Sequence, residues 1–201
     1  MKLVLASSNP GKLREIDKIL KPYGLEVVPQ SDFDVPDIEE TGLTFVENAL
    51  LKARNAAAKS GLPAISDDSG LEVDALKGKP GICSARYSGA DVTDEANVQH
   101  LLANIESVPA ERRTARFRCV AVLMQDERDP SPLICEGVWE GTIAGAPRGE
   151  NGFGYDPVFL ISGSDKTSAQ LEPVEKDRLS HRGKAFRALA EAIAAQLRSE
   201  K

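Results

Sequence analysis

Two pairs of adjacent carboxylates are the residues of this sequence most suited to chemistry. Glu39 and Glu40 lie in an acidic stretch, and Asp67 and Asp68 stand at the predicted end of a short strand, before Ser-Gly. Carboxylate oxygens suit Mg²⁺, which usually takes one or two protein carboxylates together with substrate phosphates. Adjacent like charges are unfavourable unless a cation or hydrogen bonds compensate them. Solvated charge is a strong alternative for the Glu pair, whereas the Asp pair can direct one carboxylate to a site and the other to the structure.

A polar segment between a predicted strand and a predicted helix could bind an anion. Its residues are Ser7, Ser8, Asn9, Pro10, Gly11 and Lys12. Free backbone N–H groups and the helix dipole favour negative charge there, and hydroxyl, amide and ammonium donors add to the effect. An ordinary helix cap with a solvated lysine explains the same residues. The loop is not a Walker motif, because it lacks the Gly-x-x-x-x-Gly-Lys-[Ser/Thr] pattern.

A glycine-rich segment at 149–156 places two aromatic residues on a flexible frame. It is not a dinucleotide fingerprint, because the third glycine is missing and no helix follows. Phe153 and Tyr155 would instead suit a planar ring, since stacking of a base on an aromatic side chain contributes roughly 1–3 kcal/mol. A turn whose Phe153 fills the core is the alternative that the local sequence leaves open.

Basic residues gather at the start of the last predicted helix. His181 and Arg182 follow Ser180 there, and Lys176 lies just upstream. Cations in the first turn of a helix oppose its dipole and cost roughly 0.3–1 kcal/mol for each charge. A compensating anion or an electron-rich carbonyl group would explain them, whereas a solvated face would ask nothing of His181.

The elements that must position these groups follow an α/β pattern. Apolar runs predict strands at 2–6, 25–29, 64–66 (resuming at 71–74), 115–124, 133–143 and 157–161. Apolar stripes predict helices from about 10 to 21, from 45 to 59, after 93 and from about 180. Thr44 and Glu47 predict a capping box, and Gly61 ends that helix. The strands at 115–124 and 133–143 are expected to form an antiparallel pair in a curved mixed sheet flanked by helices.

Composition limits the class of protein further. Among 201 residues, 25 Lys and Arg stand against 31 Asp and Glu, and the net charge of −6 argues against general binding to nucleic acid. The chain has no 18-residue apolar run that could span a bilayer, and its first apolar run is too short for a signal peptide. Cys83, Cys119 and Cys135 are odd in number and widely spaced, which is typical of small core residues rather than of disulfides or a zinc site. The chain has only two histidines, which excludes a multi-His metal centre. Together these features predict a soluble, reduced, cytoplasmic protein.

Short motifs in a fixed order run along essentially the whole chain. They are SSNPGK at 7–12, EETGLTF at 39–45, ENA at 47–49, LKAR at 51–54, DDSGL at 67–71, PG at 80–81, SARY at 84–87, GFGYDP at 152–157 and SHRG at 180–183. Each motif is only moderately specific, but their joint order and spacing are highly specific. The sequence thereby closely resembles the inosine triphosphate pyrophosphatase family, which acts on noncanonical purine nucleoside triphosphates, and in particular its bacterial branch.

This resemblance implies a fold, a reaction and an assembly. The fold would be α/β: an elongated, curved mixed sheet flanked by helices, with two lobes around a central active-site cleft in one domain of residues 1–201. The reaction would be Mg²⁺-dependent hydrolysis of dITP, ITP or XTP to the monophosphate and pyrophosphate. Such a house-cleaning enzyme keeps these nucleotides out of DNA and RNA. The resemblance also implies a homodimer that binds a nucleoside triphosphate as substrate, with no nucleic acid or membrane partner.

The resemblance also implies roles for the residues around the phosphates. Residues 7–12 would hold the triphosphate, and Lys52 would add positive charge nearby. One or both of Glu39 and Glu40 would serve the Mg²⁺ site, where Asp68 would act as general base or metal ligand. These roles agree with the chemistry of the residues, because a carboxylate close to a metal can orient and deprotonate water.

A second set of residues would recognise the base. In this resemblance, Phe153 would stack on the purine, and Gly154, Tyr155 and Asp156 would line the pocket. Lys176, His181 and Arg182 would read the base edge, and Ser69 would contact substrate. Donors directed at a 6-keto oxygen would reject adenine, whose 6-amino group is itself a donor. Two other functions remain open: a pyrophosphatase for altered pyrimidines, and a sensor that binds nucleotide without hydrolysis. The carboxylates argue against the sensor, because a pure triphosphate binder has less need of them.

Overall fold

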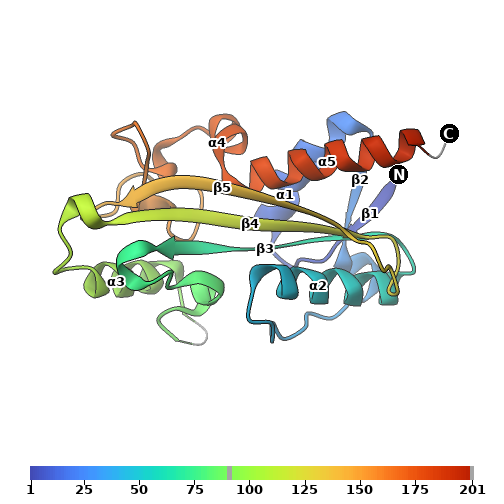
Figure 1. Ribbon diagram of the computed structural model, residues 1–201, viewed down its shortest axis with the longest axis horizontal. Coiled ribbons are helices and arrows are strands. Elements are labelled where there is room, and N and C mark those ends of the chain that lie inside the picture. Colours follow the sequence, from blue (N-terminus) through green and yellow to red (C-terminus); the bar gives the residue numbers. More distant parts are fainter. Residues whose placement is uncertain (90–91, 200–201) are drawn as a thin grey trace. The chain divides into compact units, whose positions relative to one another are not determined.

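The computed structural model describes residues 1–89 and 92–199, and its strands form a six-stranded sheet in the order β2-β1-β3-β4-β5-β6 (Figure 1). The strands are β1 (Lys2–Leu5), β2 (Glu26–Pro29), β3 (Ala64–Val73), β4 (Thr114–Met124), β5 (Leu133–Ile143) and β6 (Phe159–Ile161). The helices are α1 (Pro10–Leu20), α2 (Phe45–Ser60), α3 (Asp94–Asn104), α4 (Pro173–Leu179) and α5 (His181–Ser199). β1 pairs in parallel with β2 and β3, whereas β5 and β6 are antiparallel. The predicted α/β class with a mixed sheet and flanking helices is confirmed.

The chain divides into two compact units. Unit 1 comprises Met1–Asp68, Cys119–Gly137 and His181–Lys201. Unit 2 comprises Ser69–Arg118 and Val138–Ser180. The long strands β3, β4 and β5 contribute residues to both units. Each unit has a buried apolar core of its own.

In unit 1, alternating side chains of β1 supply both faces of the sheet. Leu3 and Leu5 are buried in a cluster with residues of α1 and α5, including Phe186. Val4 and Ala6 are buried in a second cluster with alanines of α2. Fully burying a large apolar side chain contributes about 1.5–3 kcal/mol. These contacts fix α1 and α5 on one face of the unit 1 strands and α2 on the other, as Figure 1 shows.

The ends of α2 follow the expected capping chemistry with one difference. Thr44 Oγ1 accepts a hydrogen bond from the Glu47 backbone N–H at 3.3 Å, as predicted. The Glu47 carboxylate accepts from the backbone N–H of Leu43 at 2.8 Å rather than from that of Thr44. The second half of the predicted capping box is therefore wrong, because the carboxylate reaches one residue further back. Gly61 ends the helix with φ +66°, a conformation that glycine adopts without steric cost.

The first turn of α5 lies directly against β5. A Cβ at Gly137 would collide with the carbonyl oxygen of His181 and would lie 2.7 Å from the backbone nitrogen of Ala185. The absence of a side chain at Gly137 thus lets the start of α5, with its basic residues, approach the strand. The rest of the helix is held by buried Phe186, Leu189, Ala190 and Ile193. Leu197, at the same helical spacing, is 40% exposed.

Unit 2 has an aromatic core. The ring centroid of Phe159 lies 4.6 Å from that of Phe117 and 5.3 Å from that of Trp139, and α3 adds buried Val98 and Leu101. Trp139 therefore packs in the core. Cys83 is exposed, so its interpretation as a core residue is wrong.

Two elements differ from the sequence-based expectation. β3 is one continuous strand, whereas the sequence predicts a break at 67–70, because polar residues usually mark strand ends. Here cations within the fold neutralise the polar residues, so the strand continues through them. The sequence also missed α4, which has seven residues and is too short for an apolar stripe to repeat. Within the described ranges, no helix combines the length and apolar character that crossing a bilayer requires.

Candidate functional site

The two adjacent aspartates of β3 lie beyond the end of its neighbour β1. The Ala6 backbone N–H donates to the Ile65 carbonyl at 2.8 Å, after which β1 gives way to the segment at 7–12. Side chains alternate along a strand, so Ile65 and Asp67 face the α1 and α5 side. Asp68 faces α2. The two carboxylates thus meet different partners.

Asp67 is the centre of a buried ion cluster. Its side chain is fully buried, and its Oδ1 lies 2.9 Å from Lys12 Nζ. Its Oδ2 lies 3.4 Å from Arg182 Nε, and Arg182 Nη1 reaches Glu15 Oε2 at 2.8 Å. Burial acts to raise the pKa of Asp67, but the charges of Lys12, Arg182 and Lys52 outweigh it and hold that pKa well below its usual range.

The same cluster compensates the positive charge of Arg182, for which the sequence identified no partner. A cation in the first turn of α5 needs a compensating anion, and the chain supplies Glu15 and Asp67. Burial opposes the charge on Arg182, but these carboxylates raise its pKa above the usual value. Both oxygens of Asp67 are bound to cations, so this carboxylate is committed to holding α1, β3 and α5 together.

Asp68 has a different environment. Asn48 Nδ2 donates to its Oδ2 at 3.2 Å, and Lys52 Nζ lies 3.3 Å from its Oδ1. Both partners come from one face of α2, four residues apart. Burial raises the pKa of Asp68; Lys52 opposes this shift, and the charges of Glu40 and Asp67 add to it. A carboxylate whose pKa is raised is a better proton acceptor when ionised.

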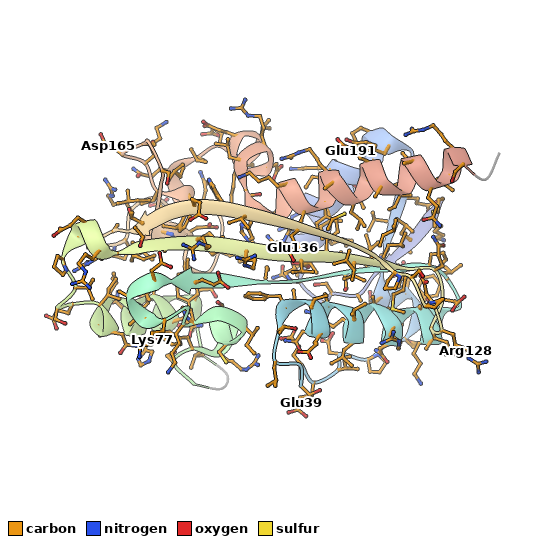
Figure 2. The ribbon with its side chains drawn as sticks, viewed as in Figure 1. Glu39, Lys77, Arg128, Glu136, Asp165 and Glu191 are labelled. Carbon is orange, nitrogen blue, oxygen red and sulfur yellow. The ribbon has the colours of Figure 1, made fainter. Side chains whose placement is uncertain are left out.

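The acidic loop brings one of its two glutamates to this site. Glu40 Oε1 lies 2.5 Å from Lys52 Nζ, so Glu40 and Asp68 bind the same ammonium group. Burial acts to lower the pKa of Lys52, but Asp68, Asp67 and Glu40 together raise it. Glu39 is exposed and points outward from the loop, as Figure 2 shows. The structure therefore separates the two glutamates that the sequence could not.

The donor set fits a hard cation such as Mg²⁺. Among residues 1–89 and 92–199, no three His, Cys, Asp or Glu side chains gather as a set that could hold a metal ion. Glu40 and Asp68 nevertheless present carboxylate oxygens on either side of one ammonium. Mg²⁺ keeps several waters and commonly takes one or two carboxylates plus substrate phosphates, so two carboxylates are sufficient.

The segment at 7–12 is an ordered helix cap. Asn9 Oδ1 accepts from the backbone N–H groups of Gly11 at 2.8 Å and Lys12 at 3.2 Å. Ser7 Oγ accepts from the Asn9 N–H at 3.2 Å. The expectation of free backbone donors at this helix start is therefore wrong for these residues, because side chains of the segment bind those N–H groups.

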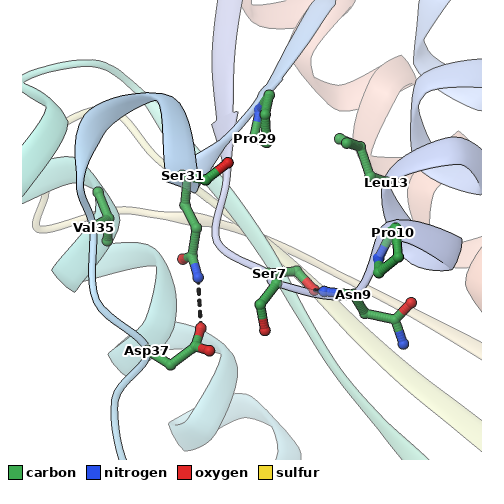
Figure 3. A pocket seen from close by; sticks show the side chains of 10 residues that line it. Ser7, Asn9, Pro10, Leu13, Pro29, Ser31, Val35 and Asp37 are labelled. Atoms are coloured by element: carbon green, nitrogen blue, oxygen red, sulfur yellow. Dashed lines mark hydrogen bonds between the residues drawn. The ribbon is translucent and has the colours of Figure 1, made fainter.

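A cavity of about 360 Å³ opens beside this cap. It lies at the carboxyl ends of β1 and β2 and is lined by Ser7, Ser8, Asn9, Pro10, Leu13, Pro29, Gln30, Ser31, Val35 and Asp37. Figure 3 shows the hydrogen bond from Gln30 Nε2 to Asp37 Oδ1, at 2.6 Å, that crosses one wall. Serine hydroxyls thus border a hollow next to the first turn of α1.

In unit 2, Phe153 lies under a cation. Lys176 Nζ is 5.0 Å from the centroid of the Phe153 ring, and it is also bound to Asp156 Oδ2 at 2.5 Å. Asp156 Oδ2 accepts from the Phe153 backbone N–H at 2.9 Å, and its Oδ1 accepts from Ser168 Oγ at 2.7 Å. The Phe153 ring is 37% exposed, so it does not fill the core. Asp156 is buried and organises this loop from within.

The residues after Phe153 anchor the loop. The Gly154 backbone N–H donates to Asp94 Oδ2 at 2.7 Å, and Tyr155 Oη donates to the Ser84 carbonyl at 2.8 Å. Burial raises the pKa of Tyr155, and the charge of Asp94 adds to that shift. These contacts hold the exposed Phe153 ring on a rigid support.

Of the predicted site residues, unit 1 brings Lys12, Lys52, Asp68 and Arg182 together around Asp67. Unit 2 contains Ser69 and the set Phe153, Gly154, Tyr155, Asp156 and Lys176. His181 is buried at the start of α5 in unit 1. The residues that contact these sets and that sequence reasoning missed include Glu15, Asn48 and Asp94. Only the ENA motif signalled Asn48, and no local pattern marked the other two.

Comparison with known proteins gives consistent findings. The sequence profile of the Ham1 family matches residues 3–192. A protein of Photobacterium profundum named dITP/XTP pyrophosphatase is 58% identical over 192 residues, which cover 96% of this chain and 98% of that protein. The solved structure of a HAM1 protein from Coxiella burnetii matches with a TM-score of 0.91 at 50% identity, over 97% of this chain and 99% of that one. The Staphylococcus aureus Ham1 protein matches with a TM-score of 0.85 at 41% identity, over the whole of both chains.

Proposed function

This chain belongs to the Ham1 family, and we propose that it hydrolyses noncanonical purine nucleoside triphosphates (dITP, ITP and XTP) to the monophosphate and pyrophosphate. The name dITP/XTP pyrophosphatase, carried by a relative 58% identical over nearly the whole chain, supports this activity. The observation that carries the proposal is the contrast between the two adjacent aspartates. Asp67 is saturated by two cations, whereas Asp68 shares one ammonium with Glu40.

Asp68 is the general base of this proposal. Its ionised carboxylate takes a proton from the attacking water, while Asn48 Nδ2 holds Oδ2 and Lys52 Nζ lies 3.3 Å from Oδ1. The surroundings, burial first, raise its pKa, which makes the ionised carboxylate a stronger base. Water activated here attacks the α-phosphorus, so pyrophosphate leaves as one unit.

Glu40 and Asp68 would hold Mg²⁺ in this proposal, and Glu39 would not. Both carboxylates bind the Lys52 ammonium, so positive charge is favourable between them. This supports the assignment. When bound, Mg²⁺ would neutralise phosphate charge and lower the pKa of a bound water. The carboxylates of Glu40 and Asp68 would orient the attacking water toward the substrate.

The positive groups of unit 1 would hold the triphosphate. Lys12 and Lys52 supply ammonium groups, and Ser7 and Ser8 supply hydroxyl donors at the edge of the cavity. The first turn of α1 adds its dipole, which favours negative charge. Asn9 contributes by fixing this turn, since its Oδ1 is used by the helix.

Phe153 would stack on the purine, with Lys176 close to its ring. Ser69, Gly154 and Tyr155 would line this side of the substrate, with Asp156 holding Lys176 and the Phe153 backbone in place. We assign His181 and Arg182 to hydrogen bonds with the 6-keto edge. Such donors reject adenine, since two opposed donors leave buried polar groups unsatisfied.

Three wider properties belong to the same proposal. Residues 1–201 act as one catalytic domain, which the continuity of β3, β4 and β5 through both units supports. The chain acts as a homodimer in the cytoplasm, which its likeness to the inosine triphosphate pyrophosphatase family supports. Sedimentation of the purified chain at about twice 21.6 kDa would agree with the dimer, and sedimentation at 21.6 kDa would refute it.

Product analysis tests the function. The purified chain is incubated with Mg²⁺ and dITP, XTP, dGTP or dATP, and pyrophosphate is separated from orthophosphate. We expect monophosphate and pyrophosphate from dITP and XTP, with dGTP and dATP nearly untouched. Equal use of all four, or a preference for altered pyrimidines, would refute the assignment of the base site. Tight nucleotide binding without turnover would establish a sensor instead.

A further inference from the structure

Asn48 is a fully buried polar side chain that links two parts of the proposed metal site. Its Oδ1 accepts from the Gly42 backbone N–H at 2.8 Å, and its Nδ2 donates to Asp68 Oδ2 at 3.2 Å. It is 0% exposed and lies on α2, one turn before Lys52. A buried amide that satisfies both a loop and a carboxylate fixes their positions relative to each other.

The orientation of the Asn48 amide follows from its partners. A backbone N–H can only donate, so it requires the amide oxygen, and a carboxylate accepts, so it takes the amide nitrogen. One hydrogen of the Asn48 NH₂ group therefore points at Asp68 Oδ2, and Asp68 Oδ1 remains on the side of Lys52. The rotation of the Asp68 carboxylate is fixed by two different donors from one helix.

Gly42 permits this arrangement. A Cβ at Gly42 would lie 2.6 Å from Asn48 Oδ1, 2.6 Å from Glu47 Cβ and 3.0 Å from the Asn48 backbone nitrogen. Separations under 3.0 Å force something to move, and here a helix side chain and backbone stand in the way. Gly42 follows Glu40, the loop carboxylate that shares Lys52, with one residue between them in the chain. The amide thus ties the loop of one carboxylate to the other carboxylate.

We propose that Asn48 is a positioning residue that sets the geometry of Glu40 and Asp68 as a pair, through Gly42 on one side and the Asp68 carboxylate on the other. This inference rests on the proposed metal-dependent hydrolysis. Asn48 takes no part in proton transfer and does not touch substrate. Groups that orient metal-binding carboxylates typically contribute about 10- to 100-fold to metal affinity or to turnover.

Asn55 provides a matched control. It lies on the same helix and its Nδ2 donates to the Pro36 carbonyl at 3.0 Å, so it also ties the acidic loop to α2. Pro36 precedes Glu40 by four residues, and within the described residues Asn55 makes no hydrogen bond to Asp68. If Asn48 served only to hold the loop, removing either amide would have the same consequence.

The experiment compares Asn48→Leu, Gly42→Ala and Asn55→Ala with the wild type. Asn48→Leu keeps the size of the side chain and removes both hydrogen bonds. Gly42→Ala leaves the amide in the chain but displaces it, and so serves where Asn48→Leu fails to fold. Two readouts are taken: kcat and KM for dITP at saturating Mg²⁺, and the affinity of the nucleotide-free chain for Mn²⁺ by electron paramagnetic resonance.

We expect Asn48→Leu and Gly42→Ala to lower kcat by about 10- to 100-fold, with KM changed by less than about 3-fold, and to weaken Mn²⁺ binding by a similar factor. Asn55→Ala should change neither quantity, even where all three variants melt at lower temperature. Equal losses in Asn48→Leu and Asn55→Ala, or wild-type kcat in Asn48→Leu, would overturn the inference. A wild type that fails to hydrolyse dITP would refute the proposed function instead. The Mn²⁺ titration would still test the role of Asn48. Equal Mn²⁺ affinities in all variants, or no Mn²⁺ binding in any of them, would overturn the inference about Asn48.

Discussion

Substituting each of the two adjacent aspartates by asparagine should have opposite consequences. The Asp67 carboxylate lies 2.9 Å from Lys12 Nζ and 3.4 Å from Arg182 Nε. At an effective dielectric constant of about 20 these separations correspond to about 6 and about 5 kcal/mol of attraction. Desolvation of the buried charges offsets much of this, and removing one partner of a buried ion pair costs about 3–5 kcal/mol. We therefore expect Asp67→Asn to lose about 3–5 kcal/mol of unfolding free energy.

Asp68→Asn should leave stability close to that of the wild type. The fold raises the pKa of Asp68, which means that the folded state disfavours its charged form. A neutral amide removes this penalty, so we expect an unfolding free energy within about 1 kcal/mol of the wild type. Turnover of dITP should instead fall by about 10²- to 10⁴-fold, the usual contribution of a general base.

Urea unfolding of the nucleotide-free variants and steady-state turnover of dITP separate the two effects. The unfolding free energy that Asp67→Asn is expected to lose is a large share of the total, because folded domains are stable by only about 5–15 kcal/mol. The reasoning would be refuted if both variants lost the same stability. It would equally be refuted if Asp67→Asn unfolded like the wild type, or if Asp68→Asn kept wild-type turnover.

Three further predictions follow from the same contacts. Phe153→Ala should raise KM for dITP by about 5- to 150-fold, which corresponds to a stacking contribution of about 1–3 kcal/mol. The loss of stability should be small because Phe153 is 37% exposed. An unchanged KM in steady-state kinetics would contradict this prediction. The lowered pKa of Asp67 should make its contribution to stability fully present above the ordinary aspartate value of 3.8 and lost as the pH falls below it. Urea midpoints from about pH 6 to about pH 2 should therefore fall less steeply in Asp67→Asn, and parallel profiles would argue against the shift. Chelation by EDTA should abolish turnover. It should leave the circular dichroism spectrum unchanged, since the buried charges of the fold are paired with one another within the chain. Activity that persists after chelation would count against Mg²⁺.

Much of the local structure is predictable because it depends on neighbours in sequence. The strand at 133–143 has the predicted bounds, and Thr44 and Gly61 begin and end α2 where capping chemistry places them. The prediction of a break at 67–70 is wrong for a physical reason. Aspartates end strands when water solvates them, and here Lys12 and Arg182, distant in sequence, neutralise Asp67 inside the sheet.

The candidate site divides in the same way. The residue types and their order indicate a phosphate-binding segment, paired carboxylates and an aromatic residue on a glycine-rich loop. They do not show that Asn9 uses its oxygen for its own helix, or that Asp156 is committed to Lys176 and Ser168. Asn48, Glu15 and Asp94 carry little or no local signal, because each acts through a partner at least 20 residues away.

By itself the sequence determined the α/β class, the motifs that carry the resemblance to a nucleotide pyrophosphatase family, and the set of carboxylates and cations from which a site could be built. Only the tertiary structure decided which partners each carboxylate binds. Alternation along β3 sends Asp67 toward α1 and α5 and Asp68 toward α2, and Lys52 selects Glu40 over Glu39. The physical reason is that the pKa and availability of a carboxylate depend on burial and on charges a few ångströms away in space. Those charges come from segments that are far apart in the chain and meet only when it folds.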